Sequence, residues 1–373
     1  MKTIFKTTWI VLFVFIAFSG FIDFISQTDD IGIGTYGVKE AIQYTLLKLP
    51  SSVFKFLSII VLIGSLLGLG ILSKNNELLV LLSSGISMRR LGLSVLMSGF
   101  ILCFLSTLVG EYFSPPMERI ADQLRTKSKY NYASLGNSKG IWLKEQNKII
   151  NINLLNENKS FGNVTIFELN DSSKIQRISR ASSSTIDDYN QWILSNLEET
   201  VFNESGLSTE FSRYKIDKTQ LDRDIVGLTV VKSEDLNILE LYKFTNYLVQ
   251  NSLDAKIYQT AFHSRIASLL VIPFICLLAL PLSLGIGRNR GVGFRVIIGM
   301  LIGITYFMLQ NTLIESAQIY QIQPILLGWI PFFILLLFLS FTFFFFFFFL
   351  LPFLFLLHFS KILSNLSPIL ITN

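Results

Sequence analysis

The chain has 373 residues, of which 51% are hydrophobic and only 15% are charged, and its mean hydropathy is +0.54. A soluble domain of this length would carry more charge, so the composition excludes an ordinary soluble globular protein. The net charge of +5 is read as a signal of membrane topology rather than of nucleic-acid binding, because its distribution between apolar runs matters more than its sum. Cys103 and Cys276 both lie in apolar runs, which indicates neither a disulfide framework nor a metal site.

Long apolar runs organise the chain. A bilayer core needs about 20 apolar residues per helix. Runs of that kind occupy residues 8–27, 54–72, 91–113, 264–287, 293–313 and 325–348, which predicts six transmembrane helices. The first run is too long for a cleaved signal peptide, and Asp23 stands where a small-residue cleavage site belongs. We therefore interpret it as a retained helix.

Basic residues in the short loops predict the orientation of these helices. The loop 73–90 carries Lys74, Arg89 and Arg90, and the loop 287–295 carries three arginines, Arg288, Arg290 and Arg295. By the positive-inside rule both loops and both termini are cytoplasmic. The long polar segment 114–257 is then predicted on the opposite side of the membrane.

The loop 73–90 also predicts a short amphipathic helix over residues 74–86. Ser73 is a candidate N-cap, Glu77 is an acid for the first turn, and Gly85 is a stop signal. The apolar stripe of this helix consists of Leu78, Leu81 and Leu82. A helix too short to span the bilayer lies on the membrane surface or docks in a groove of another protein. A helix that only connects its neighbours is the alternative.

Residues 114–232 are predicted to form an all-β domain inserted between the third and fourth transmembrane helices. Segments with partial period-2 alternation and β-branched or aromatic residues occupy 148–155, 163–169 and 191–202. Such spacing is typical of an antiparallel sandwich or an open barrel. Residues 233–257 read as a connecting helix, with Ser233 as N-cap and an apolar face of Leu236, Leu239, Tyr242 and Leu248.

The predicted layout is completed by transmembrane helices 1–3 over residues 1–113, helices 4–6 over 258–348, and an apolar tail over 349–373. Seven consecutive phenylalanines occupy 343–349, and the apolar run 325–357 exceeds the length of one span. A strongly tilted helix and a re-entrant end are alternatives. We favour a reading-frame slip in a homopolymeric stretch of the gene, which leaves a tail without function; a clean in-frame run at the locus would contradict this.

Motifs of catalytic and nucleotide-binding sites are absent from the sequence. It contains no Walker A, G-x-S-x-G, H-E-x-x-H or C-x-x-C pattern. Asp23 and Glu111 lie near the ends of their helices, whereas a proton-coupled transporter usually carries acids nearer the midplane. We therefore predict that the chain is not an enzyme and binds no metal or other cofactor, and that energy for any transport comes from elsewhere.

The stretch "LLGLGILSKNNELLVLLSSGISMRRLGLSVL" resembles the helix 2, coupling helix and helix 3 block of the LptF/LptG permeases of lipopolysaccharide export. Further segments are similar in order and spacing, among them "KTIFKTTWIVLFVFIAFSGFIDF", "GIWLKEQNKIININ", "VTIFELNDSSKIQRISRA" and "FRVIIGMLIGITYFMLQN". The similarity covers most of residues 2–340. The segments of helix 1 and of helices 5 and 6 favour the LptG branch of the family.

The resemblance implies an ABC-exporter permease of the bacterial inner membrane, with six transmembrane helices and a periplasmic jellyroll-like domain. The implied partners are an LptB-like ATPase dimer that binds ATP-Mg, an LptF-like permease and an LptC-like periplasmic protein, and the implied substrate is lipopolysaccharide. The residues 74–86 would then form a coupling helix on the ATPase. Its implied contact residues are Glu77, Leu78, Leu81, Gly85 and Arg89.

The resemblance also implies contacts to the substrate. A basic residue just after helix 3 of the family matches Arg125, and one at the start of helix 4 matches Arg265; both are alternatively snorkelling anchors at the membrane interface. Acids stand where the family carries lysines and would repel a phosphate unless a divalent cation bridges them; they are Asp23, Asp29 and Asp30. On physical grounds alone, nearby lysines could substitute for these cations, namely Lys39, Lys48 and Lys55. A substrate with fewer phosphates and cations supplied by the LptF-like partner are the alternatives.

Two other classes compete with this interpretation. A mechanotransmitting permease of the macrolide or lipoprotein exporter type places its external domain after helix 1, whereas here the domain follows helix 3. A membrane sensor or scaffold with a ligand-binding periplasmic domain usually carries a sizeable cytoplasmic output module, and the predicted cytoplasmic loops are short.

Overall fold

The computed structural model describes residues 1–130, 141–155, 161–170, 172, 174–186, 191–203, 206–218, 228, 232–285, 291–320, 322–345 and 348. The chain divides into two compact units. The helical unit comprises residues 1–18, 52–109 and 263–373, and the mixed unit comprises residues 19–51 and 110–262.

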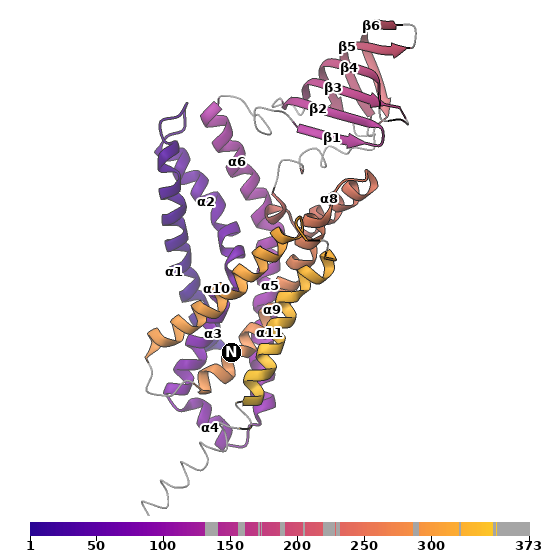
Figure 1. Ribbon diagram of the computed structural model, residues 1–373. Coiled ribbons are helices and arrows are strands. Elements are labelled where there is room, and N and C mark those ends of the chain that lie inside the picture. The colour runs from indigo at the N-terminus through magenta and orange to yellow at the C-terminus, as the bar shows by residue number, and fades with distance from the viewer. Residues whose placement is uncertain are drawn as a thin grey trace, which may run out of the picture. The chain divides into compact units, whose positions relative to one another are not determined.

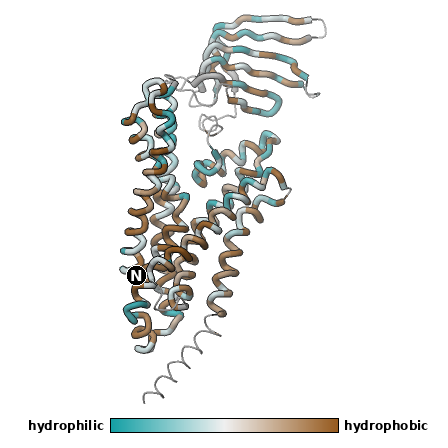
Figure 2. Tube along the Cα trace, turned by 60° about the vertical axis from the view of Figure 1, so that its left-hand side comes forward, coloured by the Kyte–Doolittle hydropathy of each residue, from teal (hydrophilic) through white to brown (hydrophobic). Residues whose placement is uncertain are grey.

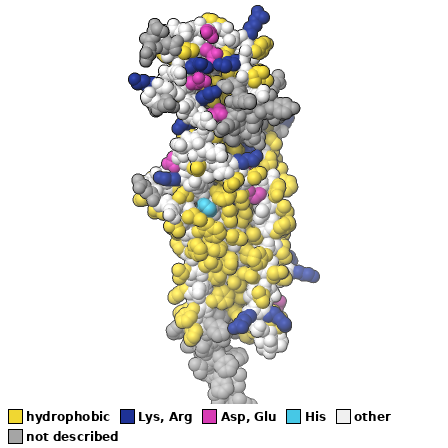
Figure 3. All heavy atoms as spheres, turned by 90° about the vertical axis from the view of Figure 1, so that its right-hand side faces the viewer, with side chains coloured by type: hydrophobic (Ala, Val, Ile, Leu, Met, Phe, Trp, Pro, Cys, Tyr) yellow, Lys and Arg dark blue, Asp and Glu magenta, His cyan; other side chains and the backbone are white. Residues whose placement is uncertain are grey.

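Six helices among the described residues are long and apolar enough to cross a membrane, as predicted. They are labelled in Figure 1 as α1 (Lys2–Ser26), α3 (Leu57–Lys74), α5 (Met88–Thr107), α9 (Lys256–Gly285), α10 (Val292–Ser316) and α11 (Pro324–Phe345). Hydrophobic residues run along them (Figure 2), and hydrophobic side chains cover the face of the helices seen in Figure 3. Phe13, Leu301 and Leu337 are each more than 60% exposed. An apolar exterior of this kind suits contact with lipid.

Small residues bring these helices close together. Gly64 of α3 faces α1, where the Thr7 hydroxyl donates to the Gly64 carbonyl at 2.7 Å. A Cβ on Gly64 would lie only 2.6 Å from the Cα of Thr8. The same close approach joins α10 to α3, α5 to α9 and α11 to α9, at Gly299, Gly303, Gly99 and Gly328. In lipid, helices associate through such tight packing because the hydrophobic effect between them is missing.

The second segment of the mixed unit, residues 110–262, begins with helical structure rather than with a strand. A π-helical turn at Leu108–Phe113 follows α5 and leads into α6 (Ser114–Tyr130). The β-domain predicted from residue 114 therefore differs from the structure, in which the first strand begins at Ile141. The segment 114–130 is polar and opens with two prolines, but proline is well tolerated in the first turn of a helix. The unit also contains most of α2 (Val38–Lys55).

The strands in the described part of the chain form one six-stranded antiparallel sheet in chain order (Figure 1). They are β1 (Ile141–Glu145), β2 (Lys148–Leu155), β3 (Phe161–Leu169), β4 (Ile175–Ile186), β5 (Gln191–Asn203) and β6 (Gly206–Lys218). The strands predicted from alternation coincide with β2, β3 and β5. The described strands form a meander, whereas a jellyroll returns through Greek-key connections. A β-domain is confirmed from Ile141 onward, and its jellyroll order stays a prediction.

A break in strand pairing crosses this sheet. The paired ladder skips one row of opposed residues on β3 to β6, and we call this row the crease: Asn163, Ser182, Asn196 and Arg213. The two asparagines have φ of +48° and +50°, a left-handed backbone that asparagine tolerates better than most residues. The crease shifts the alternation of buried residues along β5. Trp192 and Leu194 are buried before Asn196 in the chain, and Leu197 is buried directly after it.

Helix α8 (Ile238–Gln250) starts later than predicted. Asn237, not Ser233, is its N-cap, and the Asn237 side chain accepts from the Glu240 N–H at 2.8 Å while the Glu240 carboxylate accepts from the Asn237 N–H at 3.0 Å. Ser233 opens a separate 3-10 turn. The predicted apolar face is wrong at Leu239 and Tyr242, which are 62% and 55% exposed. The buried face consists of Leu241, Phe244, Tyr247 and Leu248.

Side chains near the end of α8 bind the edge strand β1. The Tyr247 hydroxyl accepts from the Lys144 N–H at 3.1 Å and donates to the Lys144 carbonyl at 3.0 Å. The side-chain amide oxygen of Asn251 accepts from the Gln146 N–H at 2.9 Å. Burial raises the pKa of Tyr247, which keeps the hydroxyl proton available for this contact. The main-chain groups near the end of this edge strand are thereby hydrogen-bonded.

We expect Gly64→Ala to destabilise the helical unit by roughly 1–3 kcal/mol, the usual cost of overpacking a tight contact. Its Cβ would press against Thr8. Thermal unfolding of the protein in detergent measures the effect. Gly293→Ala is the matched control, since nothing lies within 4 Å of a Cβ at that position. Equal unfolding temperatures for the two variants would contradict the packing described here.

We expect Asn237→Ala to cost about 1 kcal/mol of local stability, because it removes a helix cap. Ser233→Ala should leave α8 unchanged, since Ser233 opens a different turn. Hydrogen exchange of the α8 amides measures both. Faster exchange in Ser233→Ala than in Asn237→Ala would show that the cap is misassigned.

Candidate functional site

The predicted short helix between α3 and α5 is present as α4 (Glu77–Ser83). It begins after Asn76 rather than at Ser73. Its end is a Schellman motif, in which the Ile86 N–H donates to the Leu81 carbonyl and the Gly85 N–H to the Leu82 carbonyl, both at 3.2 Å. Gly85 has a φ of +90°. This left-handed position makes Gly85 the stop signal, as predicted, but the helix ends at Ser83 rather than at residue 86.

The exposed side of α4 differs from the predicted stripe. Leu78 is 1% exposed and packs within its own unit, so it is absent from the helix surface. Four exposed residues form what we call the α4 surface, namely Glu77, Leu79, Val80 and Leu81. Leu82 of the predicted stripe is half-buried. The Asn75 amide donates to the Glu77 carboxylate at 3.3 Å. Arg89 is also exposed, in the first turn of α5.

Arg295 was predicted in a loop but lies in a helix. It belongs to α10 and is 2% exposed. Its Nη1 donates to the Gly70 carbonyl of α3 at 3.2 Å, and a Cβ on Gly70 would lie 2.7 Å from the Arg295 Cδ. Within the described residues, its Nε and Nη2 have no hydrogen-bond partner. Arg288 and Arg290 lie outside the described residues.

The predicted substrate-binding cations are divided between the two units. Arg265 and Lys55 belong to the helical unit, and Lys39, Lys48 and Arg125 belong to the mixed unit. Arg265 is 8% exposed, and its guanidinium lies 4.7 Å from the ring centroid of Phe54, a cation–π distance. Lys39 is exposed and Lys55 is half-buried.

Tyr44 of α2 brings Lys48 and Arg125 together. The Lys48 ammonium donates to the Tyr44 hydroxyl at 3.1 Å, and the Arg125 guanidinium lies 5.5 Å from the centroid of the same ring. The buried carboxylate of Glu118 is 4.0 Å from the Lys48 nitrogen. Burial disfavours the charged Lys48, but Tyr44, Glu118 and Asp122 outweigh it, so the pKa of Lys48 is raised. This lysine stays a cation at neutral pH.

Asp30 pairs with cations instead of standing alone as a repulsive acid. Its Oδ2 accepts from the Arg125 Nε at 2.9 Å and Nη2 at 2.5 Å, and its Oδ1 accepts from Lys129 at 2.6 Å. Asp29 is exposed. Lys129 was not predicted as a site residue. The available signal was the spacing of Arg125 and Lys129, four residues apart on one face of α6.

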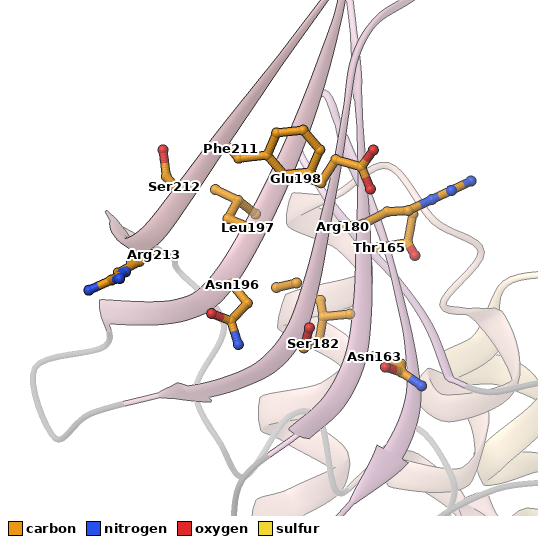
Figure 4. A pocket seen from close by; sticks show the side chains of 12 residues that line it. Asn163, Thr165, Arg180, Ser182, Asn196, Leu197, Glu198, Phe211, Ser212 and Arg213 are labelled. Carbon is orange, nitrogen blue, oxygen red and sulfur yellow. The ribbon is translucent and has the colours of Figure 1, made fainter.

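An open groove of about 540 Å³ lies on the sheet. Figure 4 shows its lining, which includes the crease, the row of residues next to it and the row after that. That row pairs across the strands as Thr165, Arg180, Glu198 and Phe211. Phe211 is 78% exposed. The groove thus combines an apolar ring with charged and amide side chains, and no residue of it was predicted as a site.

Comparisons with known proteins agree over most of the chain. The family described as "Lipopolysaccharide export system permease LptF/LptG" matches residues 1–351. The lipopolysaccharide export system permease protein LptG of Escherichia coli strain K12 is 30% identical over 343 residues, which is 91% of this chain and 95% of that protein. LptG of Haemophilus influenzae is 23% identical over 331 residues, 88% and 92% of the two chains.

The matched length decides the assignment. It includes all six apolar helices, the sheet and α4. The tail predicted to lack function, residues 349–373, lies outside the described residues, and the family match ends at residue 351. The chain belongs to the LptF/LptG family of lipopolysaccharide export permeases.

Proposed function

We propose that this chain is the permease subunit of an ABC exporter that extracts lipopolysaccharide from the inner membrane and passes it to a periplasmic bridge toward the outer membrane. The observation that carries the proposal is the similarity to LptG over 91% of the chain. Six apolar helices and membership of the permease family together indicate a multi-pass inner-membrane protein. Nothing in the described part of the chain favours the sensor or scaffold alternative.

The chemistry of the substrate supports this proposal. Lipopolysaccharide joins several acyl chains to a phosphorylated sugar head. The exposed apolar residues of the helices suit the acyl chains, and arginine suits a phosphate because its planar fork donates two parallel hydrogen bonds. Arg125 and Arg265, with Lys39, Lys48 and Lys55, are the proposed head-group contacts. The groove on the sheet offers a mixed polar and apolar surface for passage.

The α4 surface is the proposed contact with an LptB-like ATPase dimer. A seven-residue helix is too short to span a bilayer, and its exposed leucines and valine favour a partner groove. Glu77, Leu81, Gly85 and Arg89 keep their proposed coupling roles, whereas Leu78 would act by holding α4 on its own unit. ATP-Mg then binds the ATPase, and this chain carries no cofactor. The termini are cytoplasmic in this proposal.

We also propose that the sheet lies in the periplasm, on the side of the membrane opposite to the ATPase. An LptF-like permease completes the membrane part, and an LptC-like protein receives the lipid. Reconstitution tests the function: vesicles that hold the purified complex and lipopolysaccharide should transfer the lipid to a soluble acceptor only when ATP is supplied. ATP hydrolysis without transfer would contradict it.

We expect Glu77→Arg to lower ATP-driven transfer in these vesicles about tenfold, because reversing a charge at a protein contact costs at least about 1.4 kcal/mol. Glu315→Ala is the matched control for Glu77→Ala, since Glu315 is an exposed acid near the C-terminal end of α10. Glu77→Ala should weaken the coupling of hydrolysis to transfer, and Glu315→Ala should not. Unchanged coupling in both Glu77 variants would remove the role of α4.

A further inference from the structure

The segment that follows α1 is seated on α6 by its main chain. The Thr35 N–H donates to the Ser128 carbonyl at 2.7 Å, and the Thr35 hydroxyl donates to the same oxygen at 3.0 Å. A Cβ on Gly34 would lie 2.5 Å from the Lys129 carbonyl oxygen. These contacts to the main chain of α6 do not involve a charged side chain.

This seating presents the Asp30 carboxylate to two cations. One oxygen binds the fork of Arg125 and the other binds Lys129, so both oxygens are used. The side chains of Asp30 and Lys129 are only 15% and 11% exposed, while that of Arg125 is 37% exposed. Arg125 is the cation that a ligand can reach, and its Nε and Nη2 are already engaged.

A phosphate would bind this pair of cations in the same manner. Arginine binds carboxylate and phosphate oxygens through the same planar fork, and lysine binds either as a point charge. Asp30 thus occupies the donors that an anionic group would need. It also leaves the cluster of Asp30, Arg125 and Lys129 with one net positive charge in place of two.

We propose that Asp30 is a built-in competitor for anions at Arg125 and Lys129, and that it determines how strongly this permease prefers a more phosphorylated head group. The proposal rests on the proposed function, since it assumes that a phosphorylated lipid is the substrate. A head group must displace Asp30 or use the remaining donors of Arg125. The preference for a second phosphate is therefore weak in this chain and becomes strong when the carboxylate is removed.

The test is Asp30→Asn, which keeps the shape of the side chain and removes its charge. The complete permease complex is purified from membranes that contain lipid A with one and with two phosphates, and the bound lipids are quantified by mass spectrometry. We expect the ratio of bound bisphosphorylated to monophosphorylated lipid to rise about tenfold, the effect of roughly one additional ion pair. Asp29→Asn makes the same charge change on the adjacent, exposed residue and should leave the ratio unchanged.

Equal ratios in Asp30→Asn and Asp29→Asn would overturn the proposal. The double variant Asp30→Asn with Lys129→Gln restores the single net charge without the competitor, and it should still exceed the wild-type ratio. A wild-type ratio in this variant would mean that net charge alone acts. If Asp30→Asn does not accumulate, the double variant decides. A wild-type complex that holds no lipopolysaccharide would remove the proposed function as well, whereas bound lipid with an unaltered ratio removes only this inference.

Discussion

The cost of charge in lipid is the constraint on which the rest of the structure depends. Six helices carry an apolar exterior, and within the helical unit they approach each other through glycines such as Gly64 and Gly303. Two buried arginines of this unit are held by neighbouring groups. Arg265 lies over an aromatic ring, and Arg295 reaches a main-chain carbonyl. In the mixed unit, Asp30 neutralises part of a basic cluster.

Most of the fold was predictable because it depends on local patterns. Apolar runs specify the helices, and Gly85 ends α4 where its left-handed backbone requires. The errors occur where tertiary packing decides. The crease breaks the alternation of β5 between Leu194 and Leu197, so period-2 alternation is only partial there. The polar segment of α6 was predicted as part of the β-domain because it contains no apolar run that would indicate a helix.

The candidate site shows the same division. The resemblance assigned Arg125 from its position in the sequence, but the pairing of Arg125 with Asp30 joins residues 95 positions apart. No local pattern predicts it, and neither does any pattern predict the ring of Tyr44 that connects Lys48 to Arg125. The sequence alone indicates that Asp30 would repel an anionic substrate, whereas in the fold its carboxylate is paired with Arg125 and Lys129.

The most direct test of the account is to purify the tagged full-length chain from detergent-solubilised membranes and to identify the bound proteins and lipids by mass spectrometry. We expect an LptB-like ATPase, an LptF-like permease and lipopolysaccharide to be recovered together. Recovery of the chain with ordinary phospholipid and no ATPase would contradict both the export function and the role of α4 in coupling.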